Sequence, residues 1–462
     1  MTIESIYTTF VALAEEDPGA PALIDGSSFL STSRRQLLDR ADELASTLSS
    51  RGVAEGTVVA IQLPNSVDFV AAILATLRLH SVALPIDRDS RSSEVAQVID
   101  RLGVKAVIRG SPREVTSVQP AASRRAAEGT AVLKLTSGST GDPRAIITPE
   151  SCLIADCRNI TSTMLIRADD RNLGAIPFSH SYGFSNLVTP LLLQGTSIVI
   201  SNDYVPISLI ELSNRFSCTV LPGIPLMFDL LSQTLASDGQ FETVRTFISA
   251  GAPLTARVSH RFRERFGKEI HTFYGCSETG GITYDRAGAA AERNEVGSAM
   301  DGVELSTDVE SGRMVVRSDA VARGYFGGTP GEEERFSSAG FITDDIASLH
   351  SDGSVQLVGR VGGQINTAGK KVNPREVEAV LMQLDGVRDA KVYGEPAGAR
   401  GEVVAAAVVA DPAITREQIR GHCRQKLSSH KVPRIIKLID SIPRDERGKV
   451  RKAALTELDS IR

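Results

Sequence analysis

Between residues 34 and 275 the chain alternates helix-length amphipathic segments with short apolar runs, and this alternation restricts its fold more than any other feature. Runs of this length match buried strands better than helices. Strands that alternate with helices form parallel sheets, because each crossover helix packs on a sheet face. We therefore expect an α/β fold with parallel, helix-covered sheets. The apolar runs are Val58–Leu63, Ala106–Ile108, Leu173–Ile176, Ser197–Ile200 and Cys218–Leu221.

The periodicity changes outside this region. Residues 109–130 show none and are expected to form a solvated connector. From about 296 to 360, short strand-like pieces separated by Gly, Asp and Ser predict a small antiparallel β subdomain. We place a domain boundary at about residue 361, which gives an N-terminal domain of residues 1–360 and a C-terminal domain of residues 361–462.

The C-terminal domain is predicted to be a separate α+β unit, because helical and strand-like patterns restart after Gly359–Gly363. The expected elements are a helix from Pro374 to about Leu384, strands near Ala390–Tyr393 and Val403–Val409, and a helix from Thr415 to Leu427.

Composition excludes several classes of function. The chain has 462 residues, 42% of them hydrophobic, and a formal charge of −5 with no basic stripe, so nucleic acid is not an expected partner. Five cysteines without paired spacing indicate neither a disulfide framework nor a zinc site. No secretory pattern begins the sequence and no apolar run is long enough to span a bilayer, so we expect a cytoplasmic protein.

A loop rich in hydroxyl groups and glycine directly follows the apolar run Ala131–Leu135. Glycine lets backbone N–H groups point at phosphate oxygens, and serine and threonine add hydroxyl donors, so the loop suits a polyphosphate. The common P-loop ends in Gly-Lys-Ser or Gly-Lys-Thr, whereas Asp142, Pro143 and Arg144 follow the last glycine here. An ordinary surface turn uses the same residue types. The candidate phosphate-binding residues are Thr136, Ser137, Gly138, Ser139, Thr140, Gly141 and Arg144.

Three further motifs follow the loop in order, and with it they resemble the acyl-adenylate-forming superfamily. They are Tyr274–Thr279 (Tyr-Gly-Cys-Ser-Glu-Thr), Thr343–Asp345 with Gly359–Arg360, and Gly448–Lys449. Similar segments at 247–254, 321–325 and 371–378 extend the resemblance from about residue 20 to about residue 456. The superfamily contains acyl- and aryl-CoA synthetases, the adenylation domains of peptide synthetases and firefly-type luciferases.

The resemblance implies a large N-terminal domain of helix-covered parallel sheets with a small antiparallel β subdomain, and a small α+β C-terminal domain on a hinge. The chain is most similar to an acyl-CoA synthetase, which implies an AMP-forming ligase that uses ATP, Mg²⁺ and coenzyme A. Such an enzyme converts a small carboxylic acid to an acyl-adenylate and then to a thioester. Two alternatives stay open: loading of an acyl or peptidyl carrier protein, and non-catalytic binding of acyl nucleotides.

The resemblance also implies roles for single residues around the nucleotide. Glu278 corresponds to a glutamate that binds the metal, and carboxylate oxygen is a ligand that Mg²⁺ prefers. Asp345 corresponds to an acceptor for the ribose hydroxyls and Arg360 to a donor for ribose or phosphate oxygens. Taken singly, these side chains would also fit solvated carboxylates and a surface ion pair, and Tyr274 a core aromatic. The other implied nucleotide contacts are Gly251, Ala252, Pro253, Tyr274, Gly275 and Ser277.

Lys449 corresponds to the catalytic lysine, whose ammonium stabilises charge that develops on the carboxylate and the α-phosphate. Composition alone would assign its basic segment, residues 442–452, to a solvated tail, and Lys452 is the rival lysine. A lysine on a small domain reaches the nucleotide in only one domain orientation, so the resemblance implies a hinge, at Gly362. A plain linker is the alternative.

The segment Pro177–Phe184 corresponds to the lining of the acyl pocket, with His180 beside the substrate carboxylate as a catalytic residue. Adenylation domains for α-amino acids have an aspartate in this segment; none is present here, so an amino acid is disfavoured. Aryl, branched and fatty acids stay open, and His180 would also fit an interior histidine. The implied pocket residues are His180, Tyr182, Gly183, Ala250, Gly251 and Cys276.

Some positions depart from the family pattern. Arg144 replaces a lysine and Ala145 the glycine after it, Asp344 occupies a glycine position, and Gly363 stands where aspartate is common. Arg144 keeps the charge, but its planar fork differs from a compact ammonium, so we expect altered nucleotide affinity rather than inactivity.

Overall fold

The structure of the chain is a computed structural model. It divides into unit 1, comprising Met1–Ser306, Val315–Ile342 and His350–Val355, and unit 2, comprising Thr307–Met314, Thr343–Leu349 and Gln356–Arg462. The predicted boundary at about residue 361 stays a prediction about which part of the chain moves as a body. The structure describes residues 5–90, 92–110, 114–117, 125–126, 128–137, 143–234, 240–327, 333–337, 339–360, 365–367, 370–396, 402–427, 429, 431–444, 450 and 455.

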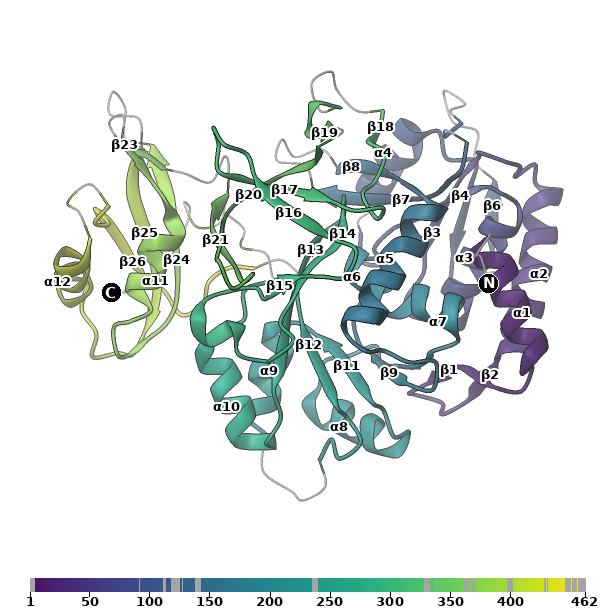
Figure 1. Cartoon of the computed structure of the whole chain (residues 1–462), viewed down its shortest axis with the longest axis horizontal. Coiled ribbons are helices and arrows are strands. Elements are labelled where there is room, and N and C mark those ends of the chain that lie inside the picture. The colour runs from purple at the N-terminus through teal and green to yellow at the C-terminus, as the bar shows by residue number, and fades with distance from the viewer. Residues whose placement is uncertain are drawn as a thin grey trace. The chain divides into compact units, whose positions relative to one another are not determined.

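A nine-stranded sheet dominates the described part of unit 1, in the order β15-β14-β13-β12-β11-β9-β10-β1-β2 (Figure 1). The strands from β13 to β1 are parallel; β14 is antiparallel to β13, and the edge strands β15 and β2 are antiparallel to their neighbours β14 and β1. The strands are β1 (Pro21–Asp25), β2 (Ser31–Ser33), β9 (Arg171–Gly174), β10 (Ser197–Ile200), β11 (Val220–Gly223), β12 (Thr246–Ser249), β13 (Ile270–Cys276), β14 (Gly280–Tyr284) and β15 (Ser298–Ala299).

A second sheet, seven-stranded within the described residues, has the order β18-β8-β7-β4-β3-β5-β6. Its inner strands β7, β4, β3 and β5 are parallel, while β6, β8 and β18 run antiparallel to their neighbours. The strands are β3 (Val58–Gln62), β4 (Val82–Pro85), β5 (Ala106–Arg109), β6 (Val115–Ser117), β7 (Thr130–Ser137), β8 (Pro143–Pro149) and β18 (Tyr325–Phe326). The expected helix-covered parallel sheets are therefore confirmed.

The predicted connector at 109–130 is wrong in part, because β6 lies within it and pairs with β5. Val115 of this strand is only 3% exposed. A three-residue strand with one inward side chain has too short a pattern to be seen as periodic.

Helices separate and cover the two sheets. Alternation along β10 shows the layers, because Ile198 and Ile200 share a core cluster with α1, α2, α3 and α7, whereas Val199 packs with α8, α9 and α10. The first cluster also contains Val59 and Ile61 of β3, so one core cluster joins these helices to both sheets. The helices of unit 1 are α1 (Ile6–Glu16), α2 (Arg34–Ser50), α3 (Val67–Arg78), α4 (Ser92–Leu102), α5 (Glu150–Thr163), α6 (Ser181–Gly183), a π-helical turn (Phe184–Val188), α7 (Thr189–Gln194), α8 (Pro206–Arg215), α9 (Pro225–Ser232) and α10 (Ala256–Phe266).

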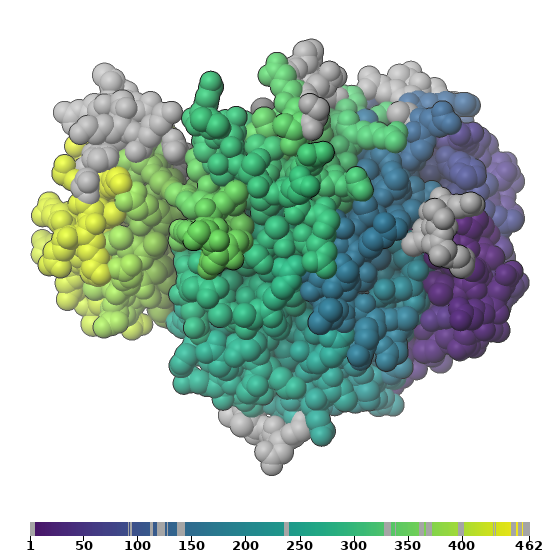
Figure 2. Space-filling model, in the orientation of Figure 1, coloured from purple at the N-terminus to yellow at the C-terminus, as the bar shows by residue number. Residues whose placement is uncertain are grey.

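Sequence explains the position of two of these helices. α3 is apolar nearly all round and is buried, as a helix without a polar face must be. α2 begins at a capping box, in which the Ser33 hydroxyl accepts from Gln36 N and the Gln36 side chain accepts from Ser33 N. Its polar residues face solvent, so α2 forms part of the purple surface of unit 1 (Figure 2).

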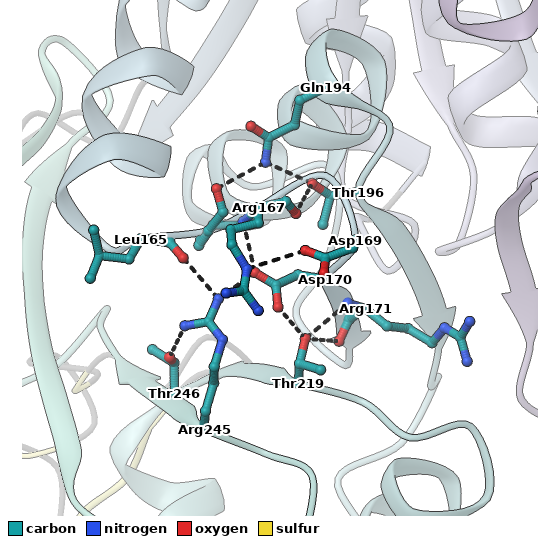
Figure 3. Close-up of polar contacts among 11 residues, drawn as sticks. Leu165, Arg167, Asp169, Asp170, Arg171, Gln194, Thr196, Thr219, Arg245 and Thr246 are labelled. Atoms are coloured by element: carbon teal, nitrogen blue, oxygen red, sulfur yellow. Dashed lines mark hydrogen bonds and ion pairs between the residues drawn. The ribbon is translucent and has the colours of Figure 1, made fainter. Parts of the chain in front are cut away.

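A buried polar network holds the amino ends of β9, β11 and β12 together (Figure 3). Asp170, 1% exposed, accepts from the Thr219 hydroxyl at 2.7 Å and from Arg167 N at 2.7 Å, and pairs with the Arg245 guanidinium. Arg245 also donates to Leu165 O at 2.8 Å. These residues stand just before the strands, so the network fixes the edge opposite to the carboxyl ends.

Short strands connect the two units along the chain. They form a sheet in the order β16-β17-β20-β19, with β21 paired to β20. Their bounds are β16 (Glu304–Thr307), β17 (Arg313–Arg317), β19 (Phe336–Ser337), β20 (Gly340–Leu349) and β21 (Val355–Arg360).

Unit 2 contains a three-stranded sheet in which β24 is antiparallel and β26 parallel to β25. The buried Leu455 packs in a core cluster with Ala405 and Ala407, and its carbonyl accepts from Tyr393 Oη at 3.1 Å and Lys437 Nζ at 3.2 Å. The first helix predicted for the C-terminal domain, Pro374 to about Leu384, is α11, and it ends three residues earlier, at Leu381. The elements are β22 (Ile365–Thr367), β23 (Lys370–Val372), α11 (Pro374–Leu381), β24 (Val387–Pro396), β25 (Glu402–Ala410), α12 (Arg416–Lys426) and β26 (Ile435–Leu438).

Among the described residues, no helix is long and apolar enough to span a bilayer.

Candidate active site

The carboxyl ends of the parallel strands in the nine-stranded sheet carry several segments singled out from the sequence. β9 leads into residues 175–184, β12 into Ala250–Pro253, and β13 ends at Cys276. β9 lies between β10 and β11, so the following strands are added on opposite sides of it. Ligands of open α/β sheets bind at the carboxyl ends of the strands at such a switch point.

His180 is held by a carboxylate from the other sheet of unit 1. Its Nε2 lies 2.9 Å from Oδ2 of Asp87, which follows β4, and both side chains are half-buried. Asn65 secures the same segment, because its Nδ2 donates to Ile176 O at 2.9 Å and its Oδ1 accepts from Phe178 N at 2.7 Å. The two sheets are thus joined at the place where the acyl pocket was expected.

Ser181 connects this segment to the motif at 274–279. Its hydroxyl donates to the Ser277 hydroxyl at 2.7 Å. Next to it, the Tyr182 hydroxyl donates to Ile248 O at 2.9 Å. Burial raises the pKa of Tyr182 well above its ordinary value, so this phenol stays protonated. Residues from the predicted pocket and from the predicted nucleotide motif therefore lie together.

Glycine is required at two positions for different reasons. A Cβ on Gly183 would lie 2.1 Å from Pro177 O, so close backbone approach excludes any side chain. Gly251 has a φ of +83°, which L-residues rarely adopt. Ala250 is buried, whereas Gly251–Pro253 are exposed, which leaves this turn open to a ligand.

The motif at 274–279 forms an irregular end to β13. The register shifts between Tyr274 and Gly275, and Tyr274 is half-buried. The Cys276 sulfur lies 3.2 Å from the Thr279 hydroxyl, and burial raises the pKa of the Cys276 thiol. The Cys276 thiol therefore stays protonated near neutral pH and does not act as a thiolate nucleophile.

Asp156 of α5 supports this motif from beneath. Its Oδ1 accepts from Gly281 N at 2.9 Å and its Oδ2 from the Ser185 hydroxyl at 2.6 Å. The side chain is 2% exposed. A Cβ on Gly280 would lie 2.2 Å from the same carboxylate. One buried carboxylate thus joins β14, the strand directly after the motif, to the helical segment after His180.

Glu278 accepts a hydrogen bond from a tyrosine outside its motif. Tyr325 Oη donates to Glu278 Oε1 at 3.1 Å, and Arg335 Nη1 donates to Tyr325 Oη at 3.4 Å. Burial, and next the charge of Glu278, raise the pKa of Tyr325, which keeps the phenol protonated. The Arg144 guanidinium lies 5.4 Å from the centroid of the Tyr325 ring. Arg144 and Glu278 therefore meet around one aromatic ring.

The hydroxyl-rich loop joins two antiparallel strands. Thr136 and Ser137, expected in the loop, are instead the last residues of β7, where they pair with Arg144 and Pro143 of β8. A P-loop joins a strand to a helix, so the β7–β8 hairpin differs from it in architecture as well as sequence. Gly138, Ser139, Thr140 and Gly141 lie outside the described residues.

In unit 2, Arg313 secures the segment that was expected to bind ribose. Its Nε donates to Thr343 O at 2.7 Å, and its Nη2 lies 3.3 Å from Asp344 Oδ1. Asp344, which stands at a glycine position of the family, thus has a local role. Asp345 is 9% exposed, and its N donates to the Thr343 hydroxyl at 3.2 Å. Arg360 is the last residue of β21, and its side chain is outside the described part.

Two further predicted residues lie outside the described residues altogether: the hinge residue Gly362 and the catalytic Lys449. The chain neighbour of Lys449, Val450, forms an antiparallel bridge with Arg444. The Arg444 guanidinium in turn pairs with Asp389 at 2.8 Å. The residues on either side of the lysine segment are therefore anchored within unit 2.

Sequence reasoning gave no role to five residues that position this site: Asn65, Asp87, Asp156, Tyr325 and Arg335. Tyr325 is the last residue of the family segment 321–325, which was a signal for it. Asp87 directly follows the apolar run 82–86, so its place at the end of a predicted strand was a signal as well. Arg335 stands in a charged stretch without periodicity, and nothing in the sequence marks it.

The sequence matches the model of the AMP-binding enzyme family over residues 10–326, and that of the AMP-binding enzyme C-terminal domain over residues 376–449. The chain belongs to the AMP-binding enzyme family. This AMP-binding enzyme is 23% identical to the long-chain-fatty-acid–CoA ligase FadD13 of Mycobacterium tuberculosis, with 96% of each chain covered. It is 27% identical to feruloyl-CoA synthase of an Amycolatopsis species, with the same coverage.

A solved structure of similar fold is ATP-bound MatB from Rhodopseudomonas palustris, with a TM-score of 0.87, 26% identity and 98% of each chain covered. These similarities make the AMP-binding enzyme an AMP-forming ligase of the acid–thiol type.

Proposed function

We propose that the chain is an ATP- and Mg²⁺-dependent ligase that joins a small carboxylic acid to coenzyme A. A carboxylate oxygen attacks the α-phosphorus of ATP, the bond to the β-phosphate oxygen breaks, and pyrophosphate leaves. The thiol of CoA then attacks the acyl carbonyl as its proton is lost, and AMP leaves. The carrying observation is the contact of Ser277 with Ser181, which brings the proposed acyl pocket beside the residues proposed for nucleotide and metal.

The nucleotide is proposed to lie across the carboxyl ends of β12 and β13. Adenine would contact Tyr274 and the exposed turn Gly251–Pro253, and the hydroxyls of the β7–β8 hairpin would bind the phosphates. Asp345 and Arg360 are proposed for the ribose, and Lys449 for the charge that develops in the transition state. Rotation about Gly362 would bring the lysine in and move it away before the thiol attacks.

Magnesium fits the donor set at Glu278. Within the described ranges, no group of three or more His, Cys, Asp or Glu side chains forms a metal cage. Mg²⁺ does not need one, because it commonly uses one or two carboxylates, substrate phosphates and water. One oxygen of Glu278 accepts from Tyr325, and a carboxylate has about four lone-pair sites, so a ligand position is retained. Bound there, the metal would neutralise phosphate charge.

The acid is proposed to lack an ammonium group. The segment Pro177–Phe184 contains no acidic residue, and Oδ2 of the nearby Asp87 is engaged by His180 rather than presented to an ammonium group. The named relatives act on long-chain fatty acids and on ferulic acid, so both alkyl and aryl acids belong in a test.

The test is ATP–pyrophosphate exchange by the purified chain with Mg²⁺, across aryl, short-, medium- and long-chain acids and α-amino acids. AMP release is then measured with and without CoA. Exchange with one acid class and CoA-stimulated AMP release support the proposal. Exchange without CoA stimulation directs the search to a carrier-protein thiol. Absence of exchange with every acid, in a chain that binds ATP, would refute acid activation and favour non-catalytic nucleotide binding.

Non-catalytic binding of acyl nucleotides, the second candidate function, is motivated by three residues of the sequence. Arg144 and Ala145 replace residues of the family loop, and Gly363 stands where aspartate is common beside the proposed hinge. An Arg144→Lys variant distinguishes the ligase from the non-catalytic binding protein. Increased ATP–pyrophosphate exchange in the variant marks a working ligase site with altered nucleotide affinity. A variant that still shows no exchange supports non-catalytic binding.

A further inference from the structure

The hydroxyl of Tyr325 lies between a cation and the proposed metal ligand. It accepts from Arg335 Nη1 at 3.4 Å and donates to Glu278 Oε1 at 3.1 Å. A hydroxyl that accepts from a guanidinium becomes a stronger donor, because hydrogen bonds in a chain polarise one another. The three groups therefore form a directed chain that ends on the carboxylate.

Tyr325 is held rigidly on its own side. It lies on β18, opposite Ile146 of β8, and the flanking Gly324 O accepts from Ile147 N at 2.9 Å. Its ring packs at 74° against Phe336, with the centroids 5.4 Å apart. Backbone pairing and ring packing thus fix the position of the hydroxyl.

The Glu278 side is fixed through the same segment. Ala322 N donates to Glu278 O at 2.8 Å, so residues 322–326 bind the backbone of Glu278 and β8 at once. β8 is also the strand that closes the hydroxyl-rich hairpin.

We propose that Tyr325, supported by Arg335, is a positioning residue that orients the Glu278 carboxylate for Mg²⁺ bound with the ATP phosphates. The inference rests on the metal role of Glu278 in the proposed function. Partners of this kind behind a metal ligand commonly change metal affinity by about 10- to 100-fold when removed. Tyr325 touches neither substrate nor metal in this role.

The first test is the Mg²⁺ dependence of ATP–pyrophosphate exchange in Tyr325→Phe. The free Mg²⁺ concentration for half-maximal exchange should rise about tenfold, with the rate recovered at saturating Mg²⁺. Arg335→Met should show a smaller rise, and Arg335→Lys should keep most of the parent behaviour. Tyr7→Phe is the matched control, because Tyr7 also donates to a carboxylate, Asp42, at 2.8 Å, far along the chain. It should leave the Mg²⁺ dependence unchanged.

The second test does not require turnover. Calorimetry gives the affinity for α,β-methylene-ATP with Mg²⁺ and with EDTA, and the ratio is the metal enhancement. Tyr325→Phe should lose most of it and Glu278→Gln nearly all, with thermal midpoints close to the parent. An unchanged metal enhancement in Tyr325→Phe overturns the proposal. A loss of activity that Mg²⁺ cannot restore, together with a lowered thermal midpoint, also overturns it, because Tyr325 would then have a merely structural role. A metal enhancement that is lost in Glu278→Gln, in a chain that shows no ATP–pyrophosphate exchange, would refute the ligase function but not the positioning role of Tyr325.

Discussion

Arg245→Met should destabilise unit 1 far more than a surface charge substitution. The substitution removes the guanidinium that pairs with Asp170, and it keeps the length of the side chain. The carboxylate is 1% exposed and has no route to water without local opening. The change therefore leaves a negative charge buried with only its neutral donors, Thr219 and Arg167 N.

The magnitude follows from the burial of the two partners. Removal of one member of a buried pair costs about 3 to 5 kcal/mol. Arg245 is itself 34% exposed and two hydrogen bonds to Asp170 remain, so solvent screens part of the interaction. We expect the free energy of unfolding to fall by about 2 to 3 kcal/mol.

Arg263→Met is the matched control. Arg263 has nearly the same exposure as Arg245, 35%, and pairs with two carboxylates, Glu269 and Glu292, at 2.6 Å each. Those carboxylates are 39% and 43% exposed, so water can solvate them after the substitution. The expected loss is below about 1 kcal/mol. The two arginines are nearly equally exposed, so the main difference between the variants is the burial of the carboxylate left behind.

Urea unfolding is the assay, followed by far-UV circular dichroism because the chain has no tryptophan. Asp170→Asn combined with Arg245→Met should be more stable than Arg245→Met alone, since the uncompensated charge is gone. Equal stability of the Arg245→Met and Arg263→Met variants would refute the reasoning.

Three further expectations concern single residues. Lys449→Ala should lower acid-dependent ATP–pyrophosphate exchange by about 10² to 10³, and unchanged exchange would remove the lysine from the mechanism. Gly183→Ala should lower kcat/KM for the acid in the exchange assay, because its Cβ would meet Pro177 O. Gly421→Ala is the control: its Cβ would meet open space, so exchange should be unchanged and stability in urea unfolding unchanged or raised. Burial raises the pKa of Tyr7 to about 12, against about 10 in the unfolded chain. The unfolded state therefore binds fewer protons than the folded state between about pH 10 and 12, and the free energy of unfolding falls as pH rises there. Urea unfolding over this range should show a shallower fall for Tyr7→Phe than for the parent. An equal slope of unfolding free energy against pH would contradict this expectation.

The layered fold was predictable because its signals are local. The run Ser197–Ile200 is β10, and the predicted last helix, Thr415–Leu427, has those residues as the caps of α12. Strand ends were less certain: the run Leu173–Ile176 corresponds to β9 at Arg171–Gly174. Pairing with neighbouring strands, rather than hydrophobicity, decides where a strand stops, and the sequence of one strand does not contain its partner.

The candidate site was predictable as a set of segments and not as a set of contacts. Motifs named Ser277 and the segment around Ser181, but their hydrogen bond joins residues 96 positions apart. The pairing of His180 with Asp87 spans 93 positions and two sheets. Such contacts depend on how distant segments of the chain pack together, which no local pattern encodes. The roles of Lys449 and Gly362 stay predictions, because both lie outside the described residues.

The anchoring of Leu455 has a consequence for protein engineering. Chain ends are usually the safest places to shorten a protein or to attach a tag. Here the end of the chain includes a fully buried leucine whose carbonyl accepts two hydrogen bonds, six residues after Lys449. Removal of residues 455–462 would give up about 1.5 to 3 kcal/mol of apolar burial within unit 2. A truncation meant only to trim the end would thereby loosen the segment that carries the lysine.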